Sequence, residues 1–457
     1  MTQHHVLHVS TDGEAVGQVF FDQREDRYTL EYDRDWAARG TAFYLSPAIP
    51  LDDVPATANS VQRFLENLLP EGRALDIAAV MNQVSKSNTF GLIHALGKEP
   101  VGALSFLALD ADVEEAARIA RQVQCEPVRR HLSSEELSSR IRERGVFPFP
   151  VWDGVVRLSL AGFQDKLQVL VEGPDISFAD GSLSSTHLLK PDSLNPNTPC
   201  IVANEHFCMT LAARIGLPVA PVEIRRLPEP ILLIERFDRR VEWDAAHPKR
   251  VLAVNRMHVI DGCQALDFPS TLKYERNLGK GEHVRNIREG VSYERLFSLL
   301  ERTRIPTTAR LFLLRWALLQ VLLGNSDAHG KNISFHVHRS GLSPAPIYDL
   351  VCVSVYGPKI ETDLAMAYGD AFTLEDITPY ALADFAMRTN TPRTQLAREI
   401  VTMANAMLKF APGLAKSEVY LGDEREHVRR IADFVCMQAN RFLKLAPEVP
   451  KIDAALL

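Results

Sequence analysis

The sequence contains no pair of cysteines in the CxxC spacing, and its six cysteines follow no regular pattern. They are Cys125, Cys200, Cys208, Cys263, Cys352 and Cys436. Disulfide frameworks of small secreted proteins and cysteine-ligated zinc sites both depend on patterned cysteines. Cysteines without a pattern are more typical of small apolar core residues in a reducing compartment. The sequence therefore argues against a disulfide-stapled fold and against a zinc site built on cysteine.

The chain also lacks a membrane or export signal. Its first residues, MTQHHVLHVSTDGEAVG, do not contain a basic segment followed by an apolar one. The longest apolar run, Leu311 to Leu323, is interrupted by Arg315 and Gln320 and is too short to span a bilayer. We therefore expect a soluble, cytoplasmic protein that has no membrane partner.

An excess of positive charge is absent as well. The formal net charge is −7 and the pI is about 6.1, which argues against a protein that coats nucleic acid by itself. Hydrophobic residues make up 46% and charged residues 24% of the 457 positions, as in ordinary globular proteins. A chain of this length is long enough for two or three domains.

Apolar periodicity divides the chain into a mixed part, a strand-rich part and a helical part. The first ~110 residues predict a hairpin around TDGEA and a helix in residues 60–72. Residues 111–145 are charged and predict a mostly helical connector, with a boundary near Pro148–Pro150. Strands are predicted for about a hundred residues from Val155, and long helices follow from about residue 256. This order favours an α+β protein with two lobes.

The segment GNSDAHGKNIS, residues 324–334, carries more polar groups than the end of the preceding apolar helix requires. Asp327 and Asn332 have the same spacing as the Asp and Asn of the protein-kinase catalytic loop. Phosphoryl transfer needs a carboxylate base, oxygen ligands for Mg²⁺ and a cation on the phosphates. Asp327 would be the base, Asn332 a metal ligand, and Lys331 would steady the transferred phosphoryl group. Asp349, in PIYDLV, stands where a second metal-binding aspartate is expected.

Four upstream features follow the order of a kinase. SLAGFQDK, residues 159–166, links two predicted strands where a phosphate loop belongs, although it lacks the G-x-G-x-x-G pattern. Lys190 ends a predicted strand, and Glu205 opens a helix 15 residues later as the expected partner of that lysine. The segment LLIERFD, residues 232–238, would offer its backbone to an adenine ring. Asp-x₄-Asn alone is a weak signal, but the complete order favours an ATP-dependent kinase.

Nine stretches resemble the HipA family of serine/threonine kinases, which are the toxins of bacterial HipBA toxin–antitoxin modules. They are FLENLLPEG, GKEPVGALSF, RLSLAGFQDKL, THLLKP, NEHFCMTLAARIGLPV, IERFDRR, DGCQALDFPSTLKYE, GNSDAHGKNIS and PIYDLV. They follow the family's order, and the resemblance covers the chain from about residue 5 to residue 440. The resemblance implies an α+β, two-lobed, protein-kinase-like fold with a β-rich N-terminal lobe, an accessory subdomain and an all-helical C-terminal lobe. The expected divisions are an accessory N-terminal subdomain at 1–150, the kinase-like N-lobe at 151–255 and the helical C-lobe at 256–457.

Site roles are implied by the same resemblance. Asp327 becomes the catalytic base, with Lys331 beside it, and Asn332 and Asp349 become ligands of Mg²⁺. The expected ATP-binding residues are Ser159, Ala161, Gly162, Phe163, Gln164, Asp165, Lys166, Lys190, Glu205, Glu235, Arg236, Phe237 and His329. Within this set, Lys190 would contact the phosphates, and Glu235 and Phe237 would lie on the adenine-binding hinge.

Partners and regulation are implied in the same way. Family members phosphorylate aminoacyl-tRNA synthetases, the glutamate enzyme above all, and so stop translation and produce dormant, drug-tolerant cells. They autophosphorylate a serine of the phosphate loop, here Ser159, which ejects that loop and switches the kinase off. The antitoxin is a HipB-like helix-turn-helix dimer that binds operator DNA. Gly330 and Ile333 depart from the Ala and Phe expected in the catalytic loop, and Phe163 and Asp165 depart in the phosphate loop. The additional glycine predicts a looser catalytic loop.

Three other functions compete with this interpretation. A small-molecule kinase of the aminoglycoside or choline type shares the Asp-x₄-Asn spacing, but the long N-terminal region favours a protein substrate. A weakly active scaffold could act as a co-repressor with its antitoxin, although no catalytic residue is missing. His329, His336 and His338 suggest a metallohydrolase, yet no further ligand completes a zinc set, so capping or surface histidines are expected.

A run of basic residues raises the question of direct DNA contact. It comprises Arg225, Arg226, Arg236, Arg239, Arg240, Lys249 and Arg250. Interleaved acidic residues neutralise most of its charge, namely Glu223, Glu229, Asp238, Glu242 and Asp244. The pattern predicts a solvated face of mixed charge, with DNA reached chiefly through the antitoxin.

Overall fold

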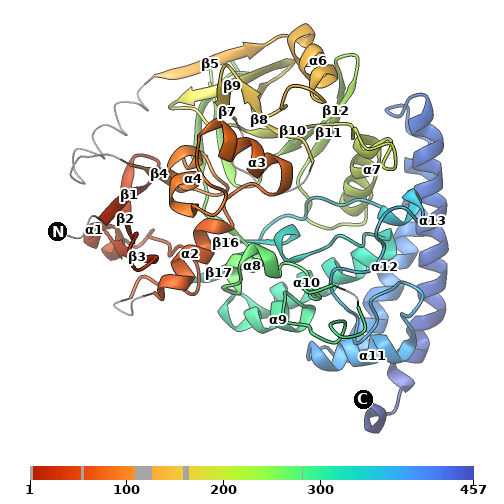
Figure 1. Cartoon of the computed structure of the whole chain (residues 1–457). Helices are drawn as coiled ribbons and strands as arrows, with labels where there is room; N and C mark the ends of the chain where they lie inside the picture. Colours follow the sequence, from red (N-terminus) through yellow and green to blue (C-terminus); the bar gives the residue numbers. More distant parts are fainter. Residues whose placement is uncertain (1–3, 53–55, 109–125, 158–163, 280) are drawn as a thin grey trace. The chain divides into compact units, whose positions relative to one another are not determined.

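The computed structural model describes residues 4–52, 56–108, 126–157, 164–279 and 281–457 (Figure 1). The chain forms two compact units. One contains Met1–Pro191, Arg225–Ile260 and Phe335–Leu342, and the other contains Asp192–Ile224, Asp261–Ser334 and Ser343–Leu457. Both units are discontinuous in sequence, and Ser159, Ala161, Gly162 and Phe163 lie outside the described residues. The three-part division at residues 150 and 255 stays a prediction.

The first unit begins with a four-stranded antiparallel sheet in the order β3-β2-β1-β4. Its strands are β1 (His4–Thr11), β2 (Glu14–Asp22), β3 (Arg27–Tyr32) and β4 (Ser105–Leu107). The predicted hairpin is present, and Asp12 and Gly13 turn the chain with positive φ angles of 44° and 81°. Leu7 and Val9 of β1 are almost completely buried, and the residues that alternate with them, His8 and Ser10, are buried as well, so both faces of this strand are covered.

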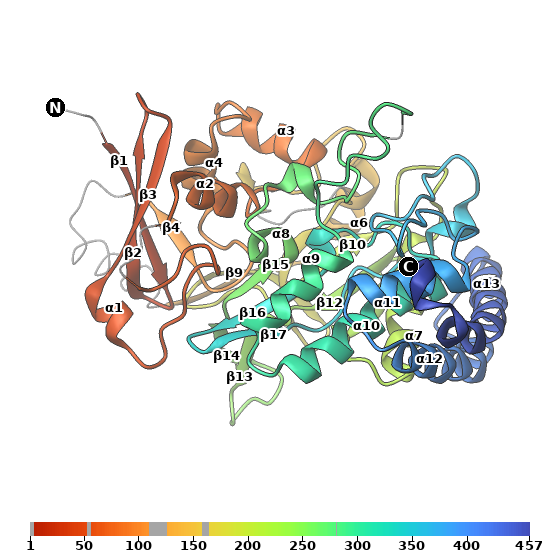
Figure 2. The same cartoon turned by 90° about the horizontal axis from the view of Figure 1, so that it is seen from below.

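Four short helices accompany this sheet, and in Figure 2 those of residues 58–66 and 89–96 lie between it and the remainder of the unit. They are α1 (Arg34–Ala38), α2 (Ala58–Glu66), α3 (Gly72–Met81) and α4 (Thr89–Leu96). The predicted helix in residues 60–72 corresponds to α2. Thr57 accepts a hydrogen bond from Ser60 N as its N-cap, and Val61, Phe64 and Leu65 are buried at helical spacing.

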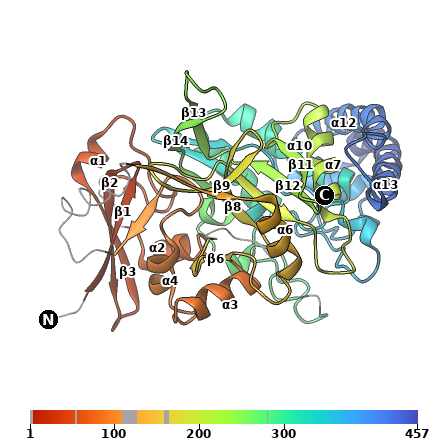
Figure 3. The same cartoon turned by 90° about the horizontal axis from the view of Figure 1, so that it is seen from above.

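The larger sheet of the first unit has the order β11-β12-β10-β8-β9-β5. Its strands are β5 (Pro127–Leu132), β8 (Leu167–Glu172), β9 (Asp175–Gly181), β10 (His187–Pro191), β11 (Val222–Arg226) and β12 (Pro230–Glu235). Helix α6 (Ser134–Glu143) covers one face, because its Leu137 and Ile141 belong to the same buried cluster as Leu167 and Val169 (Figure 3). The expectation of a mostly helical segment at 111–145 is wrong for Pro127–Leu132, which pairs with β9 as a strand. Pairing with a partner strand outweighed the local charge pattern there.

Smaller β elements complete this unit and reach its boundary. They are β6 (Val151–Trp152), β7 (Val155–Val156), the ribbon of β13 (Arg239–Trp243) and β14 (Val251–Arg256), and the three-stranded sheet of β15 (Val259–Asp261), β16 (Ser334–His338) and β17 (Gly341–Pro344). Val337 N donates to His258 O at 3.0 Å. That bond fixes β16, the strand that directly follows the polar loop 324–334.

The second unit is mainly helical. Its α-helices are α7 (Ile201–Arg214), α8 (Gly262–Ala265), α9 (Tyr293–Ser298), α10 (Pro306–Leu323), α11 (Pro379–Arg388), α12 (Arg393–Leu414) and α13 (Asp423–Leu445). Its short 3₁₀ helices are Ser270–Leu272, Leu299–Arg302, Gly330–Asn332, Val353–Tyr356, Ala446–Lys451 and Ala454–Leu456. The long helices α12 and α13 run side by side (Figures 1 and 2). Their facing apolar residues, such as Ile400 and Ile431, are fully buried.

Two expectations about the whole chain are answered here. Among the described residues, Cys208, Cys263 and Cys352 are buried free thiols, as the unpatterned cysteines predicted. Within the same residues, no helix is both long enough and apolar enough to cross a membrane.

We expect acid to destabilise the first unit through His258. The ring is buried against Phe43, its Nε2 lies 2.8 Å from Leu45 O, and burial lowers the pKa of His258 from 6.5 to about 4. Because the unfolded chain binds this proton first, stability is fully present above pH 6.5 and is lost as the pH falls toward 4. In His258→Gln, the free energy of unfolding should decline less steeply across this window, by up to about 1.4 kcal/mol per pH unit. Chemical denaturation at several pH values measures this. The exposed His247, changed to Gln, is the control, and equal slopes for all three proteins would contradict the assignment.

Candidate active site

The polar loop 324–334 begins where α10 ends, and it is built to keep one carboxylate in solvent. Every residue from Trp316 to Phe335 is buried except Asp327, which is exposed. Gly324 ends the helix in a left-handed conformation with φ of 68°, where a Cβ atom would lie 2.4 Å from the Phe434 ring. Asn325 then bonds Gln320 through both its backbone and its side chain, at 2.8 and 2.9 Å. The loop therefore leaves a buried helix end and presents Asp327.

Asn332 and Asp327 are brought together as the spacing predicted. Asn332 Nδ2 donates to Asp327 O at 2.8 Å, and His329 N donates to the same carbonyl at 2.9 Å. The amide hydrogen bond sets the orientation of the Asn332 side chain, so that Oδ1 is the atom able to bind a cation. An amide oxygen and a nearby carboxylate are suitable ligands for Mg²⁺, which keeps several water or phosphate oxygens in its shell. The residues present therefore fit a magnesium ion bound together with phosphates.

His329 has a structural role in this loop. Its Nδ1 accepts a hydrogen bond from Lys331 N at 3.2 Å, so it caps the 3₁₀ turn Gly330–Asn332. Burial, with a smaller contribution from the charge of Lys273, lowers the pKa of His329 to about 3. The imidazole is therefore neutral and carries its proton on Nε2. The prediction of capping histidines is confirmed for His329, and among the described residues no group of three His, Cys, Asp or Glu could hold a metal.

Lys331 is buried, and its Nζ lies 2.6 Å from Asp261 Oδ2. Asp261 also caps α8, since its Oδ1 accepts from Gln264 N at 2.8 Å. This ion pair joins the polar loop to the N-terminus of α8. The ammonium of Lys331 thus has a carboxylate partner in addition to the phosphoryl role predicted for it.

Asp349 has a left-handed backbone with φ of 57°, which is uncommon for a residue other than glycine. The preceding Tyr348 donates its hydroxyl to Lys331 O at 2.7 Å and also bonds Ser334 Oγ at 2.8 Å. These bonds fasten the Asp349 segment to both ends of the Lys331–Ser334 stretch. The charge of Asp349 also acts to raise the pKa of His329, so the two predicted site residues are electrostatically coupled.

Glu205 is almost fully buried, at 1% exposure, in helix α7. The helix begins at Ile201, so the prediction that Glu205 opens it is wrong, and the carboxylate lies in the second turn. Its neighbour Asn204 donates Nδ2 to Cys352 O at 3.0 Å and accepts from Cys352 N at 2.8 Å. Cys352 follows Asp349 by three residues, so α7 and the Asp349 segment are fixed to each other.

The first unit contains the described residues predicted for nucleotide binding other than Glu205 and His329, which belong to the second unit. Lys190 is buried in β10, where it pairs with Leu232 of β12. Gln164 Nε2 donates to Pro191 O at 3.3 Å, and Asp165 forms an ion pair with Arg144 at 3.7 Å. Lys166 is buried at the start of β8. The described end of the predicted phosphate loop, Gln164 to Lys166, therefore lies beside the strand of Lys190.

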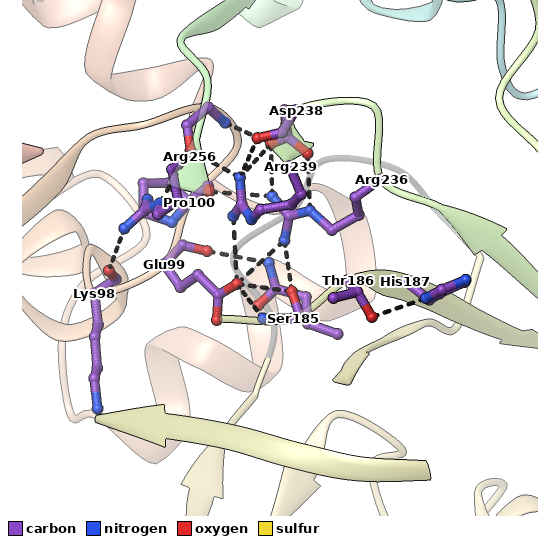
Figure 4. A network of polar contacts seen from close by, with 12 residues as sticks. Lys98, Glu99, Pro100, Ser185, Thr186, His187, Arg236, Asp238, Arg239 and Arg256 are labelled. Atoms are coloured by element: carbon purple, nitrogen blue, oxygen red, sulfur yellow. Dashed lines mark hydrogen bonds and ion pairs between the residues drawn. The ribbon is translucent and has the colours of Figure 1, made fainter. Parts of the chain in front are cut away.

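The predicted hinge leads into a buried ionic network, in which the side chains of Glu99, Ser185, Arg236, Asp238 and Arg239 converge (Figure 4). Glu235 is exposed, while Arg236 N donates to Thr186 O at 2.9 Å and Phe237 makes an edge contact with the His336 ring. The Arg236 guanidinium donates to Asp238 Oδ2 at 2.7 Å and to Ser185 Oγ at 2.9 Å. The side chain of Arg236 is therefore occupied within the protein, and any contact with an adenine would come from its backbone.

The same network extends to Arg239, Glu99 and Gly102. Arg239 Nη1 donates to Asp238 Oδ2 at 2.8 Å, Arg239 Nη2 lies 3.3 Å from Glu99 Oε1, and Gly102 N donates to Asp238 Oδ2 at 2.8 Å. Although burial alone would raise it, the pKa of Asp238 is held well below its usual range by Arg236 and Arg239. The expectation of a solvated face of mixed charge is wrong for Arg236, Asp238 and Arg239, which are buried. Complementary charges allowed them to be buried together, which spacing alone does not reveal.

Close packing against Val291 explains why residue 330 is a glycine. A Cβ atom at Gly330 would lie 2.6–3.0 Å from the three side-chain carbons of Val291, and Gly330 N donates to Lys273 O at 2.9 Å. The glycine that predicted a looser loop is instead required by the close approach of Val291.

Sequence reasoning missed Asn204, Asp261 and Tyr274, whose hydroxyl donates to Asp327 Oδ1 at 2.6 Å. For Asp261 a signal existed, because Asp-x-x-Gln is a helix capping box. Asn204 and Tyr274 carry no local signal, since their partners are 148 and 53 residues away.

Removing the Asp238 charge should destabilise the first unit strongly. Asp238→Asn keeps the shape but leaves two buried guanidinium groups short of a counter-charge, and we expect a loss of about 3–5 kcal/mol in the free energy of unfolding. Asp180→Asn is the matched control, because its ion pair with Lys98 is exposed and is worth about 0–1 kcal/mol. Urea denaturation measures both, and losses of similar size would refute a special role for the network.

Gly330→Ala should destabilise the second unit by about 1–3 kcal/mol through overpacking against Val291. Combining it with Val291→Ala should restore part of that loss, because the space taken by the new methyl group is released. The free energies of unfolding of the two single variants and the double variant form a double-mutant cycle. Strictly additive losses would show that the contact with Val291 is not the cause.

Comparisons with known proteins identify relatives of this chain. A family model described as HipA N-terminal domain matches residues 7–107, and one described as HipA-like C-terminal domain matches residues 158–410. The serine/threonine-protein kinase toxin HipA of Shewanella oneidensis is 39% identical over 96% of both chains. The protein Y4mE of Sinorhizobium fredii is 30% identical over 95% of this chain and 98% of its own.

A solved structure has a fold similar to that of this chain. It is the complex of HipA, HipB and operator DNA from the S. oneidensis toxin–antitoxin system. This chain matches one chain of that complex with a TM-score of 0.86 and 37% sequence identity. The match covers 98% of this chain and all of the other. The predicted α+β, kinase-like fold class is confirmed by this match and by the mixed helices and sheets described above. The chain therefore belongs to the HipA family and is a homologue of the serine/threonine-protein kinase toxin HipA.

Proposed function

We propose that this protein is an ATP-dependent serine/threonine kinase and the toxin of a type II toxin–antitoxin system. The observation that carries the proposal is Asp327, the single exposed residue between Trp316 and Phe335, with Asn332 bonded to its backbone carbonyl. An exposed carboxylate that a rigid, buried loop holds in place suits a base that meets a substrate hydroxyl. The 39% identity to the kinase toxin HipA gives independent support.

Asp327 accepts the proton of the attacking serine hydroxyl in this mechanism. The serine oxygen forms a bond to the γ-phosphorus of ATP, and the bond from that phosphorus to the β–γ bridging oxygen breaks. Asn332 Oδ1 and the Asp349 carboxylate would hold Mg²⁺, which neutralises charge on the phosphates when it is bound. Lys331, fixed by Asp261, keeps the loop in place between these residues.

The first unit would bind the nucleotide. Lys190 would contact the phosphates together with residues 159–166, and the backbone of 235–237 would receive the adenine. The buried carboxylate of Glu205 requires a partner of positive charge or several donors, which is consistent with the role of ion-pair partner predicted for it. The proposed division into an accessory part at 1–150, an N-lobe at 151–255 and a C-lobe at 256–457 belongs to the same proposal.

The expected substrate is an aminoacyl-tRNA synthetase, with the glutamate enzyme favoured, in the cytoplasm. Phosphorylation of such an enzyme would stop translation and produce persistence. A HipB-like helix-turn-helix antitoxin would be the partner, and operator DNA would be reached mainly through it. The similarity to a HipA chain solved with HipB and operator DNA supports this part. Autophosphorylation at Ser159 would be the off-switch, since a phosphate adds almost two negative charges beside a site for ATP phosphates.

The purified protein incubated with Mg–ATP should gain one phosphate on Ser159, and Asp327→Asn should not. Loss of the base should lower phosphoryl transfer by roughly 10²–10⁴-fold. Intact-mass spectrometry and peptide mapping measure the gain, and Asp370→Asn, at an exposed aspartate in the same unit, is the matched control.

Near-normal transfer by Asp327→Asn would overturn the assignment of the base. A starting mass that already contains a phosphate would indicate a protein purified in the inactive state. The absence of phosphate from every sample would instead favour a small-molecule kinase or a scaffold.

A further inference from the structure

Tyr274 places its hydroxyl on the exposed carboxylate of the polar loop. The hydroxyl donates to Asp327 Oδ1 at 2.6 Å, and the Tyr274 ring meets the His329 ring edge-on with centroids 5.0 Å apart. The Nζ of Lys273 lies 5.4 Å from the centroid of the Tyr274 ring. Tyr274 therefore contacts the loop at two residues, the Asp327 carboxylate and the His329 ring.

The backbone around Tyr274 is fixed on both sides. Lys273 O accepts from Gly330 N at 2.9 Å, and Glu275 N donates to Ala365 O at 3.0 Å. Ala365 N in turn donates to Ser326 O at 2.9 Å. The residues that flank Tyr274 are thus hydrogen-bonded to both sides of Asp327, directly at Gly330 and through Ala365 at Ser326.

Further bonds make this segment rigid. Glu275 is almost fully buried, and its Oε2 accepts from Ala367 N at 2.7 Å while its Oε1 receives the Arg288 guanidinium. Val291 N donates to Leu272 O at 2.9 Å. A tyrosine on such a segment brings its hydroxyl to a defined position at little further entropic cost.

An exposed aspartate has two rotatable side-chain bonds, and its carboxylate samples several orientations unless a donor restrains it. A hydrogen bond to Oδ1 restricts the rotation of the carboxylate, and it directs Oδ2 toward an incoming hydroxyl. Misplacement of a reacting group by about 1 Å can cost 10²-fold in rate, so such a restraint affects turnover.

We propose that Tyr274 is a positioning residue for the kinase reaction and holds Asp327 so that Oδ2 receives the proton of the substrate serine. This inference rests on the proposed function, because it takes Asp327 as the base. Tyr274 keeps its own proton throughout and touches neither ATP nor the phosphorus. Its effect therefore falls on the chemical step and leaves nucleotide binding unchanged.

A competing role for the same contact is a placeholder. The tyrosine hydroxyl donates to Asp327 as a substrate serine would, so Tyr274 could occupy the position of the substrate and leave when one arrives. The two roles predict opposite changes in rate, because removing a placeholder accelerates transfer and removing a restraint slows it.

The test compares wild type, Tyr274→Phe, Asp327→Asn and the double variant. Self-phosphorylation and ATP hydrolysis are followed with Mg–ATP as the probe, over a range of ATP concentrations. The control is Tyr380→Phe, at an exposed tyrosine whose hydroxyl donates to Leu456 O at 2.9 Å near the C-terminal end. Thermal midpoints of all variants are measured in parallel.

We expect Tyr274→Phe to lower the rate at saturating ATP roughly 10- to 100-fold, with the half-saturating ATP concentration unchanged within about twofold. In the Asp327→Asn background the same change should have no further effect, because the base that it positions is absent. Tyr274→Gln, which keeps an N–H donor, should recover part of the loss. A purely structural tyrosine would lower the rate in both backgrounds and would lower the thermal midpoint.

Wild-type rates in Tyr274→Phe would overturn the inference while leaving the proposed function intact. Faster transfer would overturn it in favour of the placeholder, and a rise in half-saturating ATP would assign Tyr274 to nucleotide binding. If wild type shows no turnover at all, the proposed function fails, and the inference fails with it.

Discussion

Helix α10 is buried so completely at its C-terminal end that its last carbonyl groups must find partners inside the protein. Gly324 and Asn325 meet that requirement for one of them by donating their N–H groups to Gln320 O, and Gly324 O accepts from Val353 N and Ser354 N. The chain that leaves this helix is consequently fixed residue by residue. Asp327 owes its exposed position to the burial of everything around it.

The same buried loop connects segments that are distant in sequence. Val353 and Ser354 follow Asp349, so the bonds to Gly324 O tie the aspartate segment to the end of α10. Asn204 ties α7 to the same segment through Cys352. Backbone carbonyls and amides provide most of these bonds, and charged side chains provide few. The shape of such a framework depends less on the identity of its side chains than the shape of an arrangement held by ion pairs does.

Local patterns were sufficient to predict many helices of the second unit, but few of the hydrogen bonds between segments that are distant in sequence. The apolar helix α10 and its terminal glycine depend on neighbours within a few residues and were predicted correctly, whereas the catalytic and metal-binding roles of Asp327 and Asn332 remain predictions. The strand at Pro127–Leu132 was missed because pairing with β9 outweighs a helical charge pattern. Arg236 and Arg239 were expected in solvent because a single sequence does not show that Glu99, more than 130 residues earlier, provides a counter-charge. The nucleotide-binding roles remain predictions, since Ser159 to Phe163 lie outside the described residues.

The buried network around Asp238 has a consequence for the modular appearance of the family. Glu99 and Gly102 come from the part that matches the HipA N-terminal domain, whereas Arg236, Asp238 and Arg239 come from the part that matches the C-terminal domain. The two sequence modules thus contribute charges to one buried network. The charges from either module alone do not sum to zero. A gene shortened to its second module would encode guanidinium groups that have lost part of their burial and compensation. The parts of the two modules that share these charges are therefore expected to fold together, which makes the boundary between the modules a division of sequence and not of folding.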